Sequence, residues 1–263
     1  MRIPFAQIDA FTDTPFGGNP AGVMPLSAWL PDDVLLKIAQ ENNLSETAFI
    51  VASDDGEVDF DLRWFTPAAE VALCGHATLA SGHFVLSSDT ARDRVRFRTR
   101  QAGVLEVACA DRGYTLELPA WKPSPKDMPE IVAALRIADP IETLWHEKGY
   151  ALVVVGDEDI VRDLTPDFVA LSAFPIVAIV AARGRATDIV SRVFTPYYAI
   201  DEDPVTGSAH AVMVPYWAET LGDRFSAFQA SARGGKLSCR LVDDRVVLGG
   251  ACVTVIEGTF LLP

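Results

Sequence analysis

FTPAAEVALCGHA at residues 65–77 returns, with changes, as FTPYYAIDEDPVTGSA at residues 194–209. The two Phe-Thr-Pro tripeptides begin at positions 65 and 194, and the glycines that follow them stand at positions 75 and 207. The offset between the glycines is kept further along, where Gly103-Val104-Leu105 matches Gly235-Lys236-Leu237. A constant offset over this length indicates a duplicated domain rather than a chance tripeptide. The sequence therefore predicts two similar halves.

The size and charge of the chain limit what it binds. Its 263 residues are enough for about two domains of roughly 150 residues each. Hydrophobic residues make up 49% and charged residues 22%, which is typical of a globular protein with a buried core. The net charge of −14 argues against nucleic acid or an anionic membrane surface as partner, because both bind basic faces. A small anionic substrate is compatible with this charge, since backbone N–H groups can bind it locally.

Cysteine spacing and hydropathy indicate the compartment. The four cysteines form no C-x-x-C pair, so we expect free thiols in a reducing environment. The N-terminus lacks a basic segment followed by an apolar one, and no secretory signal is expected. The most apolar run, residues 173–182, is ten residues long and too short to span a bilayer. We therefore expect a cytoplasmic protein with no membrane segment.

Hydrophobic periodicity predicts an α+β fold in which each half has a mostly antiparallel or mixed sheet wrapped around one long central helix. These two helices are expected directly after Gly75 and Gly207, and further helix starts are expected near residues 31–33 and 165–167. Residues 119–130 hold four prolines and are the predicted linker between domain 1 (residues 1–118) and domain 2 (residues 131–263). The prediction includes the option that the last strand of domain 2 pairs with domain 1. After a weakly alternating stretch at 5–11, strands are expected at residues 21–24, 47–52, 59–65, 94–98, 104–108, 114–118, 150–155, 176–181 and 190–195.

Several common chemistries have no signature in this chain. No G-x-G-x-x-G motif follows a strand, and the Gly-Gly-Lys at residues 234–236 lacks the rest of a phosphate loop. Ser208 does not lie in a G-x-S-x-G nucleophile elbow. His76 and His83 are seven residues apart, but no third ligand has metal spacing. The sequence thus predicts no metal site and gives no indication of a nucleotide site.

The two glycines at the expected helix starts point to binding of an acidic group. The first turn of a helix has free backbone N–H groups and a partial positive charge. Two such helix starts, at Gly75 and Gly207, would make a cradle for a carboxylate in a cleft between the halves. The alternative is that both are ordinary turn glycines before buried helices.

Reactive side chains differ between the two copies. Glu46 corresponds to Pro175, and Asp203 corresponds to Val71, so each half supplies one carboxylate that the other lacks. Carboxylates near the substrate can act as general acid or base. A solvated glutamate at a strand entry, or an aspartate that caps a helix, would explain the same residues without catalysis.

Cys74 corresponds to Thr206, so the two-cysteine arrangement of a racemase is not available. A thiol at a helix N-terminus can be activated, but a buried small residue is the simpler interpretation of Cys74.

Short motifs stand in order along nearly the whole chain: DAFT at 9–12, FGGNPAGV at 16–23, SETAF at 45–49, FTP at 65–67, CGHAT at 74–78, DPVTGSA at 203–209 and VTVIEG at 253–258. Taken together, these motifs resemble the PhzF-like (phenazine biosynthesis protein) family of the diaminopimelate-epimerase-like superfamily. The resemblance implies two similar domains, a homodimer, no cofactor and an active site between the domains. It also implies that Glu46 shuttles a proton and that His76, Asp203 and Ser208 accompany it.

The sequence predicts an isomerase that transfers a proton next to a carboxylate or carbonyl of a small anionic substrate. One alternative is a racemase or epimerase that uses Cys74 with a carboxylate. Another is a non-catalytic binding module with the same fold. The candidate catalytic residues are Glu46, His76, Asp203 and Ser208, and the candidate substrate-binding residues are Asn19, Gly75, Gly207 and Ser208.

Overall fold

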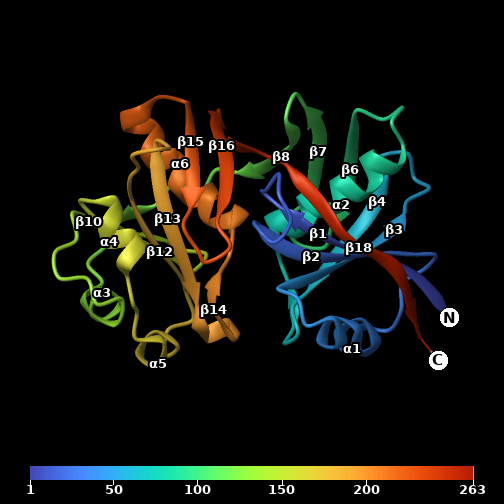
Figure 1. Ribbon diagram of the computed structural model, residues 1–263, viewed down its shortest axis with the longest axis horizontal. Helices are drawn as coiled ribbons and strands as arrows, with labels where there is room; N and C mark the ends of the chain where they lie inside the picture. The colour runs from blue at the N-terminus through green and yellow to red at the C-terminus, as the bar shows by residue number, and fades with distance from the viewer. Residues whose placement is uncertain (263) are drawn as a thin grey trace. The chain divides into compact units, whose positions relative to one another are not determined.

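The computed structural model describes residues 1–262 and divides into two compact units (Figure 1). Unit 1 comprises residues 1–117 and the chain from Gly249 onward, and unit 2 comprises residues 118–248. The chain enters unit 2 within strand β8 (Gly113–Pro119) and leaves it within β17 (Arg245–Gly250). Unit 1 is therefore built from two separate stretches of sequence.

In unit 1 a mixed sheet is made by β1 to β8 and the C-terminal strand β18. Strand β1 pairs antiparallel with both β2 and β18, while β2 runs parallel to β3. Strand β3 is antiparallel to β4, which runs parallel to β6. The elements of unit 1 are β1 (Arg2–Ala10), β2 (Asn19–Leu26), α1 (Asp32–Asn42), β3 (Glu46–Ala52), β4 (Phe60–Phe65), β5 (Glu70–Val71), α2 (Gly75–Ser88), β6 (Arg94–Thr99), β7 (Val104–Ala110) and β18 (Cys252–Leu261).

Unit 2 repeats this pairing plan. Strand β11 runs parallel to β12, β12 is antiparallel to β13, and β13 runs parallel to β15, as for β2, β3, β4 and β6. The prediction of two similar mixed-sheet domains is confirmed. The elements of unit 2 are β9 (Ser124–Pro125), α3 (Pro129–Ala134), β10 (Glu142–His146), β11 (Tyr150–Val154), α4 (Glu158–Asp163), α5 (Phe168–Leu171), β12 (Val177–Arg183), β13 (Ile189–Thr195), η1 (Pro196–Tyr198), β14 (Ile200–Asp203), α6 (Gly207–Leu221), β15 (Arg224–Gln229) and β16 (Gly235–Val242).

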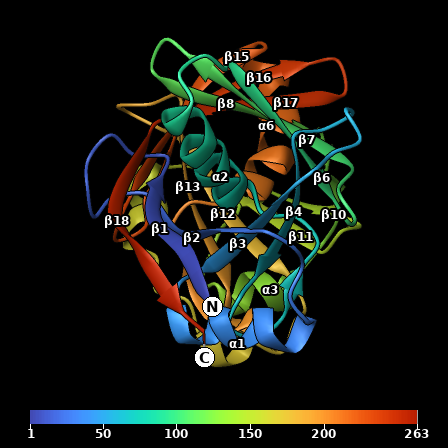
Figure 2. The same cartoon turned by 90° about the vertical axis from the view of Figure 1, so that its right-hand side faces the viewer.

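Each unit holds one buried central helix, as predicted. Helix α2 packs against β1, β2, β3, β6, β7 and β18, and Figure 2 shows it among these strands. Residues 75–82 of α2 are all buried, and so are residues 207–215 of α6. A helix buried on every side needs small or apolar residues all round, which these segments supply. None of the helices in residues 1–262 is long and apolar enough to cross a membrane.

The Pro-rich segment at residues 119–130, predicted as a linker, makes backbone contacts within unit 2. Pro215 lies inside α6 and has no N–H to donate to the carbonyl of Ala211. The N–H of Trp121 donates to this carbonyl instead, at 2.9 Å. Strand β9 in the same segment pairs with β10. The Pro-rich segment is thus attached to α6 through the carbonyl of Ala211, which Pro215 leaves without its helical donor.

The helix expected near residues 165–167 is shorter than the pattern suggests. Asp167 caps α5 by accepting a hydrogen bond from the N–H of Ala170 at 3.0 Å, but α5 has four residues. The longer helix in this region is α4, with six residues, which follows β11 as α1 follows β2. The sequence pattern therefore marks the cap of α5 but misses α4, the helix that matches α1.

Gly82 allows α2 to approach β7 closely. A Cβ at this position would lie 2.3 Å from Cγ1 of Val107. We expect Gly82→Ala to lower the free energy of unfolding by about 1–3 kcal/mol, although alanine favours a helix, because overpacking outweighs propensity. Urea unfolding measures the loss, which should shrink in a Val107→Ala background. Gly258→Ala is the control, since its Cβ meets nothing within 4 Å; equal losses at positions 82 and 258 would contradict the close approach.

Candidate active site

Four of the side chains singled out from the sequence meet at one place in unit 1. Glu46 begins β3 and lies beside β2, whose first residue is Asn19. Cys74 precedes α2, and His76 is the second residue of that helix. His76 Nε2 lies 3.1 Å from Glu46 Oε2, while His76 Nδ1 lies 3.5 Å from Cys74 Sγ and 3.1 Å from Asn19 Nδ2. The imidazole thus stands between a carboxylate and a thiol.

The pair formed by Glu46 and His76 is withdrawn from water. The side chain of His76 is 3% exposed and that of Glu46 is 14% exposed. The facing atoms, Glu46 Oε2 and His76 Nε2, are both buried. They lie close together, but their relative orientation does not make a hydrogen bond. Neither atom has another hydrogen-bond partner within residues 1–262. A small movement of either side chain would therefore create a short path for a proton.

Opposed effects set the protonation of this cluster. Burial disfavours the imidazolium form of His76, but the contacts with Cys74 and Glu46 outweigh it and raise the pKa of His76 well above its ordinary value. Burial, followed by the charge of Glu46, raises the pKa of the Cys74 thiol to about 11. Because the thiol therefore keeps its proton near neutral pH, we assign the stabilisation of the imidazolium to Glu46.

The start of α2 has no side-chain cap. Cys74 has an extended backbone and its side chain makes no capping hydrogen bond, and the first turn of α2 contains no acidic residue. The carbonyl of Cys74 receives the N–H of Thr78 at 3.2 Å, so the helix begins with Gly75. The first N–H groups and the helix dipole remain suited to an anion. The role of Gly75 in binding an acidic group stays a prediction.

The start of α6 in unit 2 has the same form. Thr206 is extended and makes no side-chain cap, and the first turn of α6 also lacks an acidic residue. Ser208, at the position that His76 holds in α2, is buried at 8% exposure. The hydroxyl of Thr206 donates to Asp203 Oδ2. Asp203 and Ser208 are thus placed on either side of the helix start that begins at Gly207.

Gln229 orders this segment and was not singled out from the sequence. Its Nε2 donates to the backbone carbonyl of Asp203 at 2.7 Å, and its Oε1 accepts from the N–H of Thr206 at 2.8 Å. The side chain is fully buried at the end of β15. The sequence signal for Gln229 was its position in a strand whose side chains alternate between buried and less buried, because it follows the buried Phe225 and Ala227 at a spacing of two. Such an amide must find buried hydrogen-bond partners.

An arginine–glutamate clasp is present in both copies of the repeat. Arg63 binds Glu70 with two hydrogen bonds of 2.7 Å, and Arg192 binds Glu202 with two of 2.7 and 2.9 Å. Each guanidinium also lies 5.0 Å from the ring centroid of the phenylalanine two residues later. Each clasp therefore ties a strand to the segment that leads into a central helix. The two arginines are separated by the same offset as the Phe-Thr-Pro tripeptides, and the two glutamates are separated by the same offset as the glycines at the helix starts. These shared offsets are the signal in the sequence that could have revealed the clasps.

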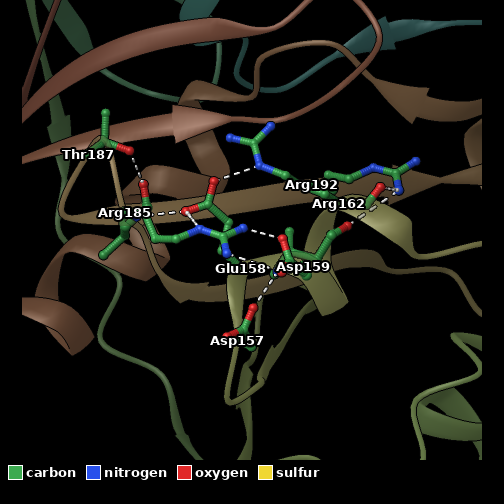
Figure 3. A network of polar contacts seen from close by, with 9 residues as sticks. Asp157, Glu158, Asp159, Arg162, Arg185, Thr187 and Arg192 are labelled. Carbon is green, nitrogen blue, oxygen red and sulfur yellow. Dashed lines mark hydrogen bonds and ion pairs between the residues drawn. The ribbon is translucent and has the colours of Figure 1, made fainter.

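In unit 2 the clasp is joined to helix α4. The Arg192 guanidinium donates to the carbonyl of Leu164, just after α4, at 2.7 Å. Figure 3 shows Arg192 beside the network in which Glu158 accepts from Arg162 Nε and from the N–H of Arg185, each at 2.6 Å. The hydrogen bond from the Arg185 N–H is the main reason why the pKa of Glu158 is lowered. This network is structural, since all of its charges are paired.

His210 makes the stability of the protein depend on pH. It is fully buried on α6, and burial lowers its pKa to about 4. An unfolded chain with an ordinary pKa of about 6.5 binds more protons between these values, so stability rises with pH across this window. We expect the wild type to lose about 2 kcal/mol more than His210→Gln between about pH 7 and pH 5. Urea unfolding at each pH measures this difference, and equal losses would contradict a buried neutral imidazole.

Comparisons with known proteins agree with this fold. The family model for phenazine biosynthesis-like proteins, PhzC-PhzF, matches residues 8–258. An uncharacterized isomerase of Pseudomonas aeruginosa is 46% identical over 266 residues and covers 100% of both chains. A crystal structure of a PhzF family protein from Enterococcus faecalis superposes with a TM-score of 0.91 at 42% identity, covering 100% of both chains. A hydroxyproline epimerase from Agrobacterium vitis shares the fold, with a TM-score of 0.63 at 11% identity over 98% of this chain and 92% of its own.

Proposed function

Because the chain belongs to the phenazine biosynthesis-like (PhzC-PhzF) family, whose relative in P. aeruginosa is named an isomerase, we propose that it is an isomerase acting by proton transfer on a small carboxylate. The observation that supports this proposal is the 3.1 Å approach of Glu46 Oε2 to His76 Nε2 in a buried site. Two proton-carrying groups this close together can divide the removal and the return of a substrate proton between them.

In the proposed reaction Glu46 removes a proton from the carbon next to the substrate carboxylate. The imidazolium of His76 stabilises the charge that develops and can return a proton. The backbone N–H groups at the uncapped start of α2, beginning at Gly75, hold the substrate carboxylate, with Asn19 nearby. The roles of Gly207, Ser208 and Asp203 in binding or assisting the same reaction remain predictions, and their variants test them separately.

The contact between Cys74 and His76 favours one second candidate. A thiol 3.5 Å from an imidazole can act as a base in racemisation or epimerisation, with Glu46 as the opposing carboxylate. Two observations weigh against this candidate. The pKa of Cys74 is raised to about 11, and Thr206, at the matching place in the repeat, has its hydroxyl bound to Asp203.

A substrate screen followed by isotope exchange tests the proposal. Thermal shift with a set of small carboxylates, cyclic dienoates included, identifies ligands, and each is then incubated with the protein in D₂O. A shifted double bond with one deuterium incorporated supports the isomerase. Deuterium at a stereocentre with loss of chirality supports the Cys74-dependent racemase. Tight binding of several carboxylates with neither exchange nor conversion would contradict catalysis and leave a binding module.

A further inference from the structure

We propose that Glu46, Cys74 and His76 form a site for a thiophilic divalent cation, with Zn²⁺ as its representative. Each of the three side chains offers one ligand atom, and these atoms all lie within 4.8 Å of one another. Bond lengths of about 2.0–2.3 Å place two ligands of one cation at most about 4.5 Å apart. The three side chains therefore lie near the separation that a single metal ion requires and need to close on it by only a few tenths of an ångström.

The donor atoms select the kind of cation. A thiolate sulfur, an imidazole nitrogen and a carboxylate oxygen are all Zn²⁺ ligands, and three protein ligands leave a fourth position open for water. Mg²⁺ and Ca²⁺ prefer oxygen ligands throughout. We therefore expect Zn²⁺ and Co²⁺ to bind and Mg²⁺ not to bind. The thiol S–H bond breaks as the sulfur–metal bond forms, and the proton is released to solvent.

Unmet polar contacts support this assignment independently. Glu46 Oε2 and His76 Nε2 are buried and have no hydrogen-bond partner within the described chain, although they lie 3.1 Å apart. A buried carboxylate oxygen and ring nitrogen with unused capacity are costly unless something binds between or beside them. A metal ion held by both atoms meets that need. Cys74 Sγ, which lies 3.5 Å from the other ring nitrogen, Nδ1, becomes the third ligand by turning toward the ion at Nε2.

The elements that carry the ligands are already in place. Glu46 begins β3, while Cys74 and His76 flank the first residue of α2. The sequence prediction of no metal site considered His76 together with His83, but His83 contacts Tyr114 and Thr254 instead, each at 2.9 Å. The ligands that join His76 are separated from it by 2 and 30 positions, a spacing that matches no linear metal motif.

The duplicated half serves as an internal comparison. At the offset that relates Gly75 to Gly207, Cys74 and His76 correspond to Thr206 and Ser208. Neutral hydroxyl groups are poor ligands for Zn²⁺ compared with thiolate and imidazole. The proposal therefore predicts one thiolate-containing cation site per chain. A cation bound at Glu46 and His76 would block their proton transfer and so inhibit the enzyme. This inhibitory effect of the cation rests on the proposed function.

A Co²⁺ titration of the substrate-free full-length protein, kept reduced without added thiols, tests the site. We expect one equivalent of Co²⁺ to produce a near-ultraviolet band from a thiolate–cobalt bond. This band should disappear in Cys74→Ser and remain in Cys109→Ser, which removes an exposed thiol outside the cluster. Calorimetry with Zn²⁺ should give a Kd at least about 10-fold weaker for Cys74→Ser and for His76→Gln than for the wild type. Circular dichroism confirms that the variants are folded.

Three outcomes would overturn the proposal: no stoichiometric Zn²⁺ binding, a cobalt–thiolate band that persists in Cys74→Ser, or a band lost in Cys109→Ser. These measurements use no substrate, so they stand whether or not Glu46 proves to be the base. If a substrate is identified, inhibition by Zn²⁺ should be reversed by a chelator. Binding of Zn²⁺ without inhibition would keep the metal site and contradict the role of Glu46 and His76 in turnover.

Discussion

Glu46→Gln is expected to lower kcat by about 10²–10⁴-fold, the range for loss of a general base. Glutamine has nearly the shape of glutamate but cannot accept a proton from carbon. It also removes the charge that, with Cys74, raises the pKa of His76, so the imidazolium form of His76 becomes less favoured. The measurement is kcat on the carboxylate found by the screen, at a temperature where both proteins are folded.

The control for this variant is Glu41→Gln, which makes the same chemical change at an exposed position on α1. Its kcat should match that of the wild type. Binding of the substrate carboxylate should change little in Glu46→Gln, because the start of α2 at Gly75 is intact. Full turnover by Glu46→Gln would show that another group is the base and would remove the main support for the proposed mechanism.

Breaking the clasp in unit 1 should be the most destabilising single change among those considered. Arg63 is 3% exposed and binds Glu70 in a two-bond arrangement, with Asp32 as a second partner at 2.9 Å. Arg63→Met removes both of these hydrogen bonds and leaves Glu70 with Arg100, an exposed arginine 3.1 Å away, as its partner. Because the buried guanidinium and its contacts with both carboxylates are lost, we expect a loss of about 3 kcal/mol in unfolding free energy. Urea unfolding at neutral pH measures this loss.

Two further variants show whether the geometry or the charge of the clasp matters. Arg63→Lys keeps the charge but cannot form both hydrogen bonds, so an intermediate loss is expected. Arg98→Met removes an arginine on β6 whose partner, Asp55, is more exposed, and it should cost at most about 1 kcal/mol. If Arg63→Met lowers the unfolding free energy no more than Arg98→Met does, the clasp stabilises the fold no more than an ordinary surface ion pair.

The repeat allowed much of the fold to be predicted, because its spacing marks the same turn before α2 and before α6. Unit 2 was harder to predict where it departs from unit 1. Helix α4, which matches α1, and the following α5 have six and four residues and are too short for a clear helical period. The segment with β9 and α3 is Pro-rich, and local composition indicates a linker even where tertiary contacts hold the chain.

The site could be predicted only in part, since sequence does not give distances. The resemblance named Glu46 and His76, which are 30 positions apart, and the structure brings their side chains together. Gln229 and the two clasps were missed because each joins residues of different strands, and such partners are set by sheet pairing rather than by local spacing. The meeting of Cys74 with Glu46 and His76 could not be derived from spacing for the same reason.

The pairing of β1 with β18 has a consequence for the order in which the protein folds during synthesis. Residues 118–248 form unit 2 as one continuous stretch, whereas β1, which pairs with β2 on one side, finds its second partner strand, β18, only after residue 252 has been made. The unit that is synthesised first is therefore completed last. Until then the ribosome-bound chain carries an unprotected strand edge at β1, where association with other chains is most easily started.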